Sequence, residues 1–344
     1  MAYTTIKKPS DYFNTKLYTA NGGTLSVTGV GFQPDLVWGK QRTNAENHEL
    51  YDAVRGTTKR IQSNLTNAET TSASYLTSFD SDGFSLGSAT RLNNTNGATC
   101  VSWNWLGANG TASNTDGSIT STVSANTTSG FSIATWTTPS SGTVFDVGHG
   151  LGGKPDMMIM KSRGSTGSWW TWHIGLGDNT TDYLSLDSTN AEASISGMWG
   201  TVGAGTSTFG YTAGTSAPTS TDTVAYFFKS IKGFSKFGSY VGNGNADGTF
   251  VYTGFKPAFV IIKQTNFGNS WRMYDNKRST FNVVTKELYP NTSDAEATTD
   301  KMDFVSNGFK FRTSATNANE SGGTYIYMAF AEQPLVGDNP CTAR

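Results

Sequence analysis

The sequence has 344 residues, of which 15% are charged, and its formal net charge at pH 7 is -1. Ordinary globular chains carry about 25% charged residues, and a protein that binds a polyanion concentrates positive charge on its surface. The composition therefore predicts no binding of nucleic acid. No apolar run approaches the roughly 20 residues of a membrane-spanning helix, so we expect no insertion into a membrane.

Aromatic residues make up 12% of the chain, and Gly, Ser, Thr and Asn take the place of the missing charges. Thr and aromatic residues favour strands, whereas Gly and Asn favour turns, so the composition predicts an all-β protein. The two cysteines, Cys100 and Cys341, lie in unrelated contexts and predict no disulfide framework. The segment 1–8 lacks the apolar stretch of a signal peptide, so we expect synthesis in a cytoplasm.

Three prolines share the same spacing to a lysine six residues later and an aromatic residue seventeen residues later. The three sets are Pro34, Lys40 and Tyr51; Pro155, Lys161 and Trp172; and Pro257, Lys263 and Tyr274. Self-similarity of this kind indicates an internal repeat. The distances between successive prolines are typical of domains and are too long for a solenoid.

Other elements recur in the same order around each proline. A glycine turn and a strand-like run come first, at residues 23–28, 142–147 and 248–253. An apolar run follows the proline, at 36–38, 157–160 and 259–262, and predicts a strand covered on both faces. An Ala-Glu pair comes next, at 68–69, 191–192 and 295–296. An alternating strand then closes each copy, with the inward residues Val101, Trp103 and Trp105; Val224, Tyr226 and Phe228; and Ile326, Met328 and Phe330.

We therefore predict three tandem β-sandwich or jelly-roll-like modules of about 100 residues each, related by pseudo-repeat symmetry. The predicted units are module 1 at residues 1–106, module 2 at 131–232 and module 3 at 233–332. Residues 107–130, rich in Gly, Ser, Thr and Asn, are predicted to form a linker. Residues 333–344, with two prolines and no strand alternation, are predicted to form a C-terminal arm.

A recurrent polar motif follows the proline strand in modules 1 and 3. It reads Tyr51-Asp52-x-x-Arg55 in the first and Tyr274-Asp275-x-x-Arg278 in the third. A carboxylate three residues before an arginine forms a local ion pair that braces a turn. A catalytic role is the alternative, but module 2 carries Trp172-His173 at this place, so a structural brace is favoured.

A cluster of tryptophans in module 2 is the candidate binding surface. Trp169, Trp170 and Trp172 lie close together in the sequence and are followed by His173. Exposed aromatic rings stack on sugars, so this cluster predicts a glycan-binding platform. The alternative, which the usual behaviour of large aromatic residues favours, is that these rings fill the core of a sandwich.

No catalytic, metal or cofactor site is expected. The three histidines, His48, His149 and His173, do not occupy equivalent places and show no metal-ligand spacing. The stretch 83–87 matches a nucleophile-elbow pattern but follows a hairpin turn and leads into no helix. The glycine-rich stretch 148–153 matches a dinucleotide pattern, yet Pro155 and a strand follow it. The sequence therefore predicts a protein that is not an enzyme.

Long stretches of the chain resemble a domain of unknown function that recurs in tailed-bacteriophage virion and tail-fibre-like proteins, of a marine phage type. The resemblance is carried by residues 234–244 and 247–263, by the closing stretch 322–332 and by 148–161. Residues 13–40 and 77–86 look like the related first module. The family has no assigned catalytic or binding residues, so the resemblance implies a virion component and nothing about a site.

Two functions follow as expectations. In the first, the protein lies on the virion surface as a fibre, spike or tail-tip module that binds host surface glycans. In the second, it is a capsid or tail decoration protein with a purely structural role. Both imply other virion proteins as partners, the first adds host surface polysaccharide, and assembly into a homo-oligomer is left open.

Overall fold

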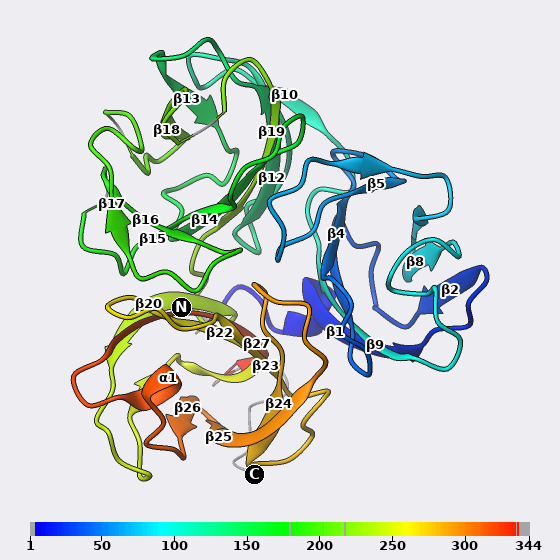
Figure 1. The fold of residues 1–344 in the computed structure, drawn as a ribbon, viewed down its shortest axis with the longest axis vertical. Helices are drawn as coiled ribbons and strands as arrows, with labels where there is room; N and C mark the ends of the chain where they lie inside the picture. Colours follow the sequence, from blue (N-terminus) through cyan, green and yellow to red (C-terminus); the bar gives the residue numbers. More distant parts are fainter. Residues whose placement is uncertain (1–3, 179, 202, 217, 335, 337–344) are drawn as a thin grey trace.

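The computed structural model describes residues 4–178, 180–201, 203–216, 218–334 and 336. Three lobes surround a common centre, and each lobe comes from one continuous stretch of chain (Figure 1). The first lobe is coloured blue to cyan, the second green, and the third yellow to red. The structure is all-β: the helical segments of the described residues are η1 (Pro9–Asp11) and α1 (Thr316–Asn319).

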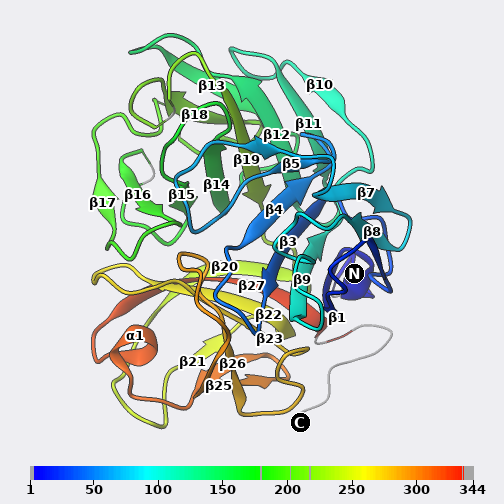
Figure 2. The same cartoon turned by 45° about the vertical axis from the view of Figure 1, so that its right-hand side comes forward.

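The first lobe has a four-stranded antiparallel sheet that faces the centre and a three-stranded sheet outside it. The order of the inner sheet is β1-β9-β3-β4, and that of the outer sheet is β2-β8-β7. A small pair, β5-β6, reaches toward the second lobe (Figure 2). The strands are β1 (Phe13–Thr19), β2 (Leu25–Thr28), β3 (Leu36–Gln41), β4 (Glu49–Asp52), β5 (Lys59–Arg60), β6 (Thr70–Thr71), β7 (Leu76–Asp80), β8 (Gly83–Leu86) and β9 (Thr99–Trp105).

The second lobe has the largest sheet, with the order β10-β11-β12-β19-β14-β15-β16-β17, and a small outer pair, β13-β18. Its strands are β10 (Ala112–Asn114), β11 (Ser121–Asn126), β12 (Phe131–Thr137), β13 (Val144–Gly148), β14 (Met157–Ser162), β15 (Trp170–His173), β16 (Asp182–Ser185), β17 (Ala193–Ser194), β18 (Thr208–Thr212) and β19 (Asp222–Phe228).

The third lobe has two four-stranded sheets, β20-β27-β22-β23 toward the centre and β21-β26-β25-β24 outside. Its strands are β20 (Ser235–Val241), β21 (Phe250–Tyr252), β22 (Phe255–Gln264), β23 (Arg272–Asp275), β24 (Val284–Glu287), β25 (Ala297–Val305), β26 (Gly308–Phe311) and β27 (Thr324–Pro334).

The strand that contains or follows each proline of the repeated spacing lies inside its sheet. These strands are β3, β14 and β22, and each pairs on one side with the closing strand, β9, β19 or β27. Every residue of β3 and β14 is buried, as is nearly all of β22, which confirms that strands of this type are covered on both faces. Lys40, Lys161 and Lys263 are each the second-to-last residue of their strand.

The four largest hydrophobic clusters of the described residues hold the molecule together. Three of them lie within single lobes, around Phe84 in the first, Phe209 in the second and Phe309 in the third. The fourth and largest draws inward-facing side chains from all three lobes, among them Trp105, Phe228 and Phe330. Trp105 lies 6.2 Å from Phe228 and 5.8 Å from Phe330, measured between ring centroids. The six inward residues predicted for the ends of the closing strands are therefore core, at 2% exposure or less.

Two predicted boundaries differ from the structure. Residues 107–130, predicted to be a linker, include strands β10 and β11, and β11 pairs with β12 from Thr122 to Asn126. Thr is common in strands, and polar side chains are accommodated on a strand face that is open to water, so the abundance of Ser and Thr did not distinguish strand from linker. Of the predicted arm at 333–344, Gln333 and Pro334 belong to β27; Val336 is also described, and the other residues lie outside the described part of the chain.

Candidate functional site

The Asp52–Arg55 pair is a fully buried brace that also reaches the second lobe. Arg55 Nε donates to Asp52 Oδ2 at 2.5 Å, and its backbone N–H donates to Asp52 Oδ1 at 2.9 Å. The remaining guanidinium donors bind the carbonyl groups of Leu50 and Lys59 and the carboxylate of Glu69. The Tyr226 hydroxyl, from β19, donates to Asp52 Oδ2 at 2.8 Å. The pair therefore fixes the turn after β4 and the contact between two lobes.

The Asp275–Arg278 pair repeats this arrangement at another junction. Arg278 Nε donates to Asp275 Oδ2 at 2.5 Å, and Arg278 also binds Glu296 and the carbonyl of Met273. The lobe-crossing donor is here the indole N–H of Trp103, 3.1 Å from Asp275 Oδ2. The carboxylate and guanidinium groups of both pairs are thus engaged within the protein, as a structural brace requires.

The second lobe uses different residues at the corresponding places. His173 stands where the other lobes have aspartate, and Leu176 where they have arginine. The closing strand it faces carries Met328, which has no N–H or O–H to donate. The His173 Nε2 atom lies 3.1 Å from the carbonyl oxygen of Tyr327, and its Nδ1 accepts from the backbone N–H of Gly175. Nε2 is therefore the protonated nitrogen and donates to the third lobe.

The glutamates of the three Ala-Glu pairs make one contact at each junction. The backbone N–H of Glu69 donates to the carbonyl of Arg163, that of Glu192 to Thr265, and that of Glu296 to Arg42. The first lobe thus binds the second, the second the third, and the third the first.

Two of these junctions carry an additional ion pair. Arg163 forms two hydrogen bonds with the Glu69 carboxylate, and Arg42 forms two with that of Glu296. Burial raises the pKa of Glu69, but the hydrogen bonds from Arg163 and Arg55 outweigh that effect and hold its pKa below the ordinary value. The third residue of this set, Thr265, has no charge to offer Glu192.

A second set of hydrogen bonds joins two of the same pairs of lobes, with the donors on the opposite side of each junction. The indole N–H of Trp169 donates to the carbonyl of Gln62 at 2.9 Å, and that of Trp271 to the carbonyl of Ser185 at 3.0 Å. His48 occupies the corresponding place in the first lobe, where its Nδ1 accepts a hydrogen bond from the indole N–H of Trp38, within the same lobe, at 3.1 Å. Burial holds the pKa of His48 well below its ordinary value.

The predicted glycan platform is not exposed in the structure. Trp169 and Trp172 are 0% exposed and His173 is 1% exposed. Trp172 packs inside the second lobe against Phe209, whereas Trp169 belongs to the central cluster. Trp170 is partly buried, with its ring edge-on to Tyr183. A ring without an accessible face cannot stack on a sugar, so the core alternative describes Trp169, Trp172 and His173 correctly.

The three repeat lysines are buried with their ammonium groups turned to carbonyl oxygens. Lys161 Nζ donates to Thr66 of the first lobe and Lys263 Nζ to Thr189 of the second, while Lys40 Nζ donates to Gln41 and Asn44. Burial lowers the pKa of each lysine to about 8. Their carbonyl partners show that they hold loops in place.

Among the described residues, no group of three or more His, Cys, Asp or Glu side chains is placed to hold a metal ion. No helix in the same part of the chain is long and apolar enough to cross a membrane. The Asn243–Asp247 turn, whose sequence is similar to a calcium loop, is closed by its own bonds. Asn243 binds the carbonyl of Asp247, and Asp247 pairs with Lys310 at 3.0 Å.

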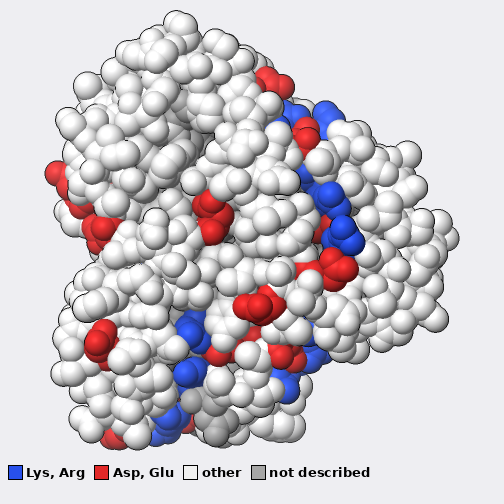
Figure 3. Space-filling view, in the orientation of Figure 1, with Lys and Arg blue, Asp and Glu red and all other residues white. Residues whose placement is uncertain are grey.

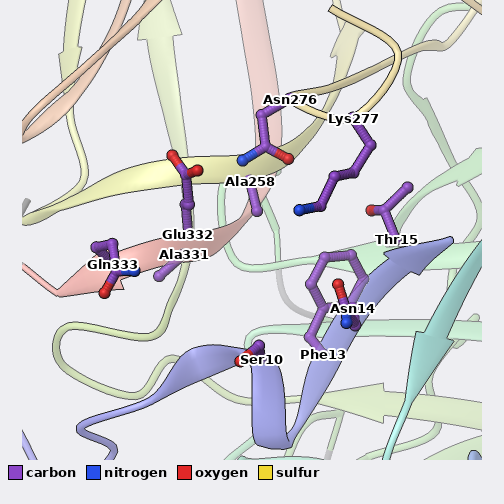
Figure 4. Close-up of a pocket in the computed structure, with 10 residues that line it drawn as sticks. All are labelled: Ser10, Phe13, Asn14, Thr15, Ala258, Asn276, Lys277, Ala331, Glu332 and Gln333. Atoms are coloured by element: carbon purple, nitrogen blue, oxygen red, sulfur yellow. The ribbon is translucent and has the colours of Figure 1, made fainter. Parts of the chain in front are cut away.

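A polar pocket of about 190 Å³ opens where the first lobe meets the third (Figure 4). β1 and the turn after β23 form opposite sides, and the ends of β27 and η1 complete it. Its lining residues are Ser10, Phe13, Asn14, Thr15, Ala258, Asn276, Lys277, Ala331, Glu332 and Gln333. The Lys277 ammonium group points into the space between Asn276 and Thr15.

Many of the charged side chains on one face of the molecule lie near the seams between the lobes. On the face drawn in Figure 3, large parts of the outer surfaces of the lobes are uncharged, and many of the Lys, Arg, Asp and Glu side chains lie along the boundaries where the lobes meet. The ion pairs between Arg42 and Glu296 and between Arg163 and Glu69 lie at such boundaries. The charged residues at the seams thus include pairs that hold lobes together.

The family model described as "Domain of unknown function (DUF7483)" matches residues 8–334. Because the match spans nearly the whole chain, the protein belongs to this family. The model runs through all three lobes as one unit. No curated protein matches the chain.

Sequence reasoning identified the residues of the brace but not their partners in other lobes. It also recorded the Ala-Glu pairs without a role, although their recurrence was the available signal for a repeated contact. The pocket residues Thr15, Asn276 and Lys277 were missed. No local pattern joins them, because they come from opposite ends of the chain.

Proposed function

We propose that the protein is a non-enzymatic component of a bacteriophage virion surface, in which one chain forms a pseudo-trimeric recognition unit for host surface glycans. Its three lobes are copies of one module arranged about a pseudo-three-fold axis. Phage appendages otherwise build three-fold arrangements from separate chains, and covalent linkage fixes the same arrangement within a single chain.

The observation that carries this proposal is the closed set of contacts between the lobes. The same Ala-Glu position binds the next lobe at all three junctions, and the inner sheets share one core. When each unit binds the next through the same pair of surfaces and the third unit binds the first, the units form a closed ring. Such a ring is a rigid block that presents its outer loops to a partner, and the motifs that could have served catalysis are used to brace it.

The large uncharged areas on the face drawn in Figure 3 support a neutral partner. A surface of this kind suits a polysaccharide better than a nucleic acid, which selects for clustered positive charge. Weak sites of about millimolar affinity become effective when many copies act together on one particle.

A purely structural decoration protein is the second candidate. The burial of Trp169 and Trp172 favours it, because these residues were the expected glycan contacts. A decoration protein needs a rigid block and a docking surface but no ligand site.

The test has two parts. Antibody labelling of intact particles in electron micrographs should place the protein on the virion exterior. Purified protein added to host cells should then reduce adsorption of the phage, because it occupies the same receptors. Absence of label from the particle would overturn the virion assignment. Exterior label with undiminished adsorption would reject recognition in favour of decoration.

A further inference from the structure

We propose that the pocket between the first and third lobes binds a single neutral sugar ring, the terminal unit of a glycan. This inference rests on the recognition function proposed above and assigns that function a site.

Two buried side chains in the pocket wall have polar atoms without a protein partner. Asn276 is 7% exposed and its Oδ1 accepts no hydrogen bond from the protein, and Thr15 is 5% exposed and its Oγ1 has no protein partner. A buried polar atom without a hydrogen bond costs about 1–3 kcal/mol, so an occupant that bonds to both atoms would be stabilised in this pocket. That occupant must donate to an amide oxygen and bond to a hydroxyl group.

The charges around the pocket select against ions. The Glu332 carboxylate lies on the wall and pairs with Lys256 at 2.8 Å. A phosphate or a carboxylate would be placed close to this group and to the Asn276 oxygen. A metal cation would be placed beside the Lys277 ammonium group instead. A neutral polyol both donates and accepts through each hydroxyl and can satisfy all of these groups.

The size of the pocket and the apolar part of its wall both suit a sugar ring. A pocket of about 190 Å³ is smaller than the roughly 300 Å³ at which sites for drug-sized ligands begin. It holds one sugar ring but no disaccharide. Phe13, Ala258 and Ala331 supply an apolar wall for the C–H groups of such a ring.

The corresponding positions at the other two junctions are apolar. Thr15 pairs with Trp103 of the closing strand in the first lobe. In the same way, Ile133 pairs with Tyr226 in the second lobe and Phe237 with Met328 in the third, so Ile133 and Phe237 occupy the places that correspond to Thr15. Lys277 comes two residues after Asp275, and the residues two after Asp52 and His173 are Val54 and Gly175. Val54 and Phe237 pack in or against the central cluster. At these corresponding positions, therefore, the polar residues are found at the junction between the third and first lobes.

The experiment measures binding of free sugars to the full chain by saturation-transfer NMR. The probes are glucose, galactose, mannose, rhamnose and N-acetylglucosamine, each titrated separately. Three variants test the site: Thr15→Val, which keeps the shape of the side chain, Asn276→Ala and Lys277→Met. Thr171→Val is the matched control, because Thr171 is also buried, with an unpartnered Oγ1, but lies in β15 of the second lobe.

We expect at least one sugar to bind and each pocket variant to weaken its affinity about tenfold or more, as the loss of one good hydrogen bond implies. Thr171→Val should bind as the wild type does. Binding that the pocket variants leave unchanged would reject this site while preserving the recognition function. Absence of binding to every sugar would reject the site, and the adsorption assay would then decide separately whether recognition fails too. Thermal melts identify any variant that fails to fold, and Thr15→Val then carries the test.

Discussion

The buried arginines Arg55 and Arg278 each connect an aspartate, a glutamate and backbone carbonyls through one guanidinium group. Fully buried charges are tolerated only when paired and hydrogen-bonded. Tyr226 or Trp103 continues each network into the next lobe. The junction between the second and third lobes lacks the network as a set: its members are replaced together by His173 and Leu176 of the second lobe and by Thr265 and Met328 of the third.

Substitution of Arg55 by methionine should lower the free energy of unfolding by about 3–5 kcal/mol, because Asp52 would be left buried without its cation. Denaturant melts of the full chain measure this loss. Lys8→Met is the control, since the Lys8–Asp11 pair is exposed and should contribute at most about 1 kcal/mol. Equal effects of the two substitutions would contradict the role assigned to Arg55.

The stability of the protein should fall as the pH decreases from 6.5 toward 4. Burial lowers the pKa of both His149 and His173 from 6.5 to about 4, so the unfolded chain binds protons in this interval before the folded one does. The contribution of each histidine is therefore present above pH 6.5 and is lost as the pH falls through this range. A shift of this size corresponds to roughly 3 kcal/mol per histidine.

His173→Gln tests this prediction, because the glutamine amide can still donate to the Tyr327 carbonyl but does not titrate. Its unfolding free energy, measured by urea melts between pH 4 and 7, should depend less steeply on pH than that of the wild type. His149→Gln serves as the comparison and should reduce the slope independently. A wild-type slope in both variants would show that other groups govern the acid sensitivity.

At the scale of the elements, the closing strands β9, β19 and β27 lie inside the inner sheets, and their large side chains meet at the centre. Trp105 packs against Phe13, Phe131, Phe228 and Phe330. Trp105→Ala should therefore cost about 3–5 kcal/mol of unfolding free energy. Val241→Ala in the edge strand β20, where the side chain is 57% exposed, should cost much less. A small loss for Trp105→Ala in denaturant melts would show that the centre repacks easily.

The strands were predictable where the pattern was local. An unbroken apolar run such as Met157–Met160 can only be a covered strand or a buried helix, and its short length favoured the strand. The partners of the strands were not predictable, because a hydrophobic pattern reports that a face is covered but not by which element. The segment of β10 and β11 was predicted to be a linker because it is rich in Thr and Ser and has no apolar run that would indicate a covered strand.

The candidate site was less predictable than the fold. The Asp-x-x-Arg spacing correctly indicated a brace, because both partners lie within one turn. The tryptophans of the second lobe were ambiguous, since aromatic clustering fits a core and a binding platform equally well. The indole N–H of Trp169 donates to the carbonyl of Gln62 in another lobe, more than a hundred residues away in the sequence. The sequence around Trp169 could not reveal this partner, which holds the ring in the core.

At the scale of the whole molecule, the central cluster makes the three lobes interdependent. Removal of one lobe would expose the inner faces of the other two to water, and the lost burial would cost about 25 cal/mol per Å². We expect one cooperative thermal transition, with equal calorimetric and van't Hoff enthalpies. A fragment containing residues 1–106 alone should not fold as a monomer. Separate transitions for the lobes, or a stable isolated fragment, would contradict this expectation.

The polar pocket lies where the described part of the chain begins and ends, since η1 and the last residues of β27 both line it. The ring of lobes is covalently continuous at two junctions and open at this one. Closeness of the two segments to be joined is the condition under which circular permutation succeeds. Joining the end of β27 to the start of η1 through a designed peptide and reopening the chain near Gly110, which has open space around it, should preserve the fold. The permuted protein would turn the seam beside the pocket into a continuous connection and place its new ends at a different junction.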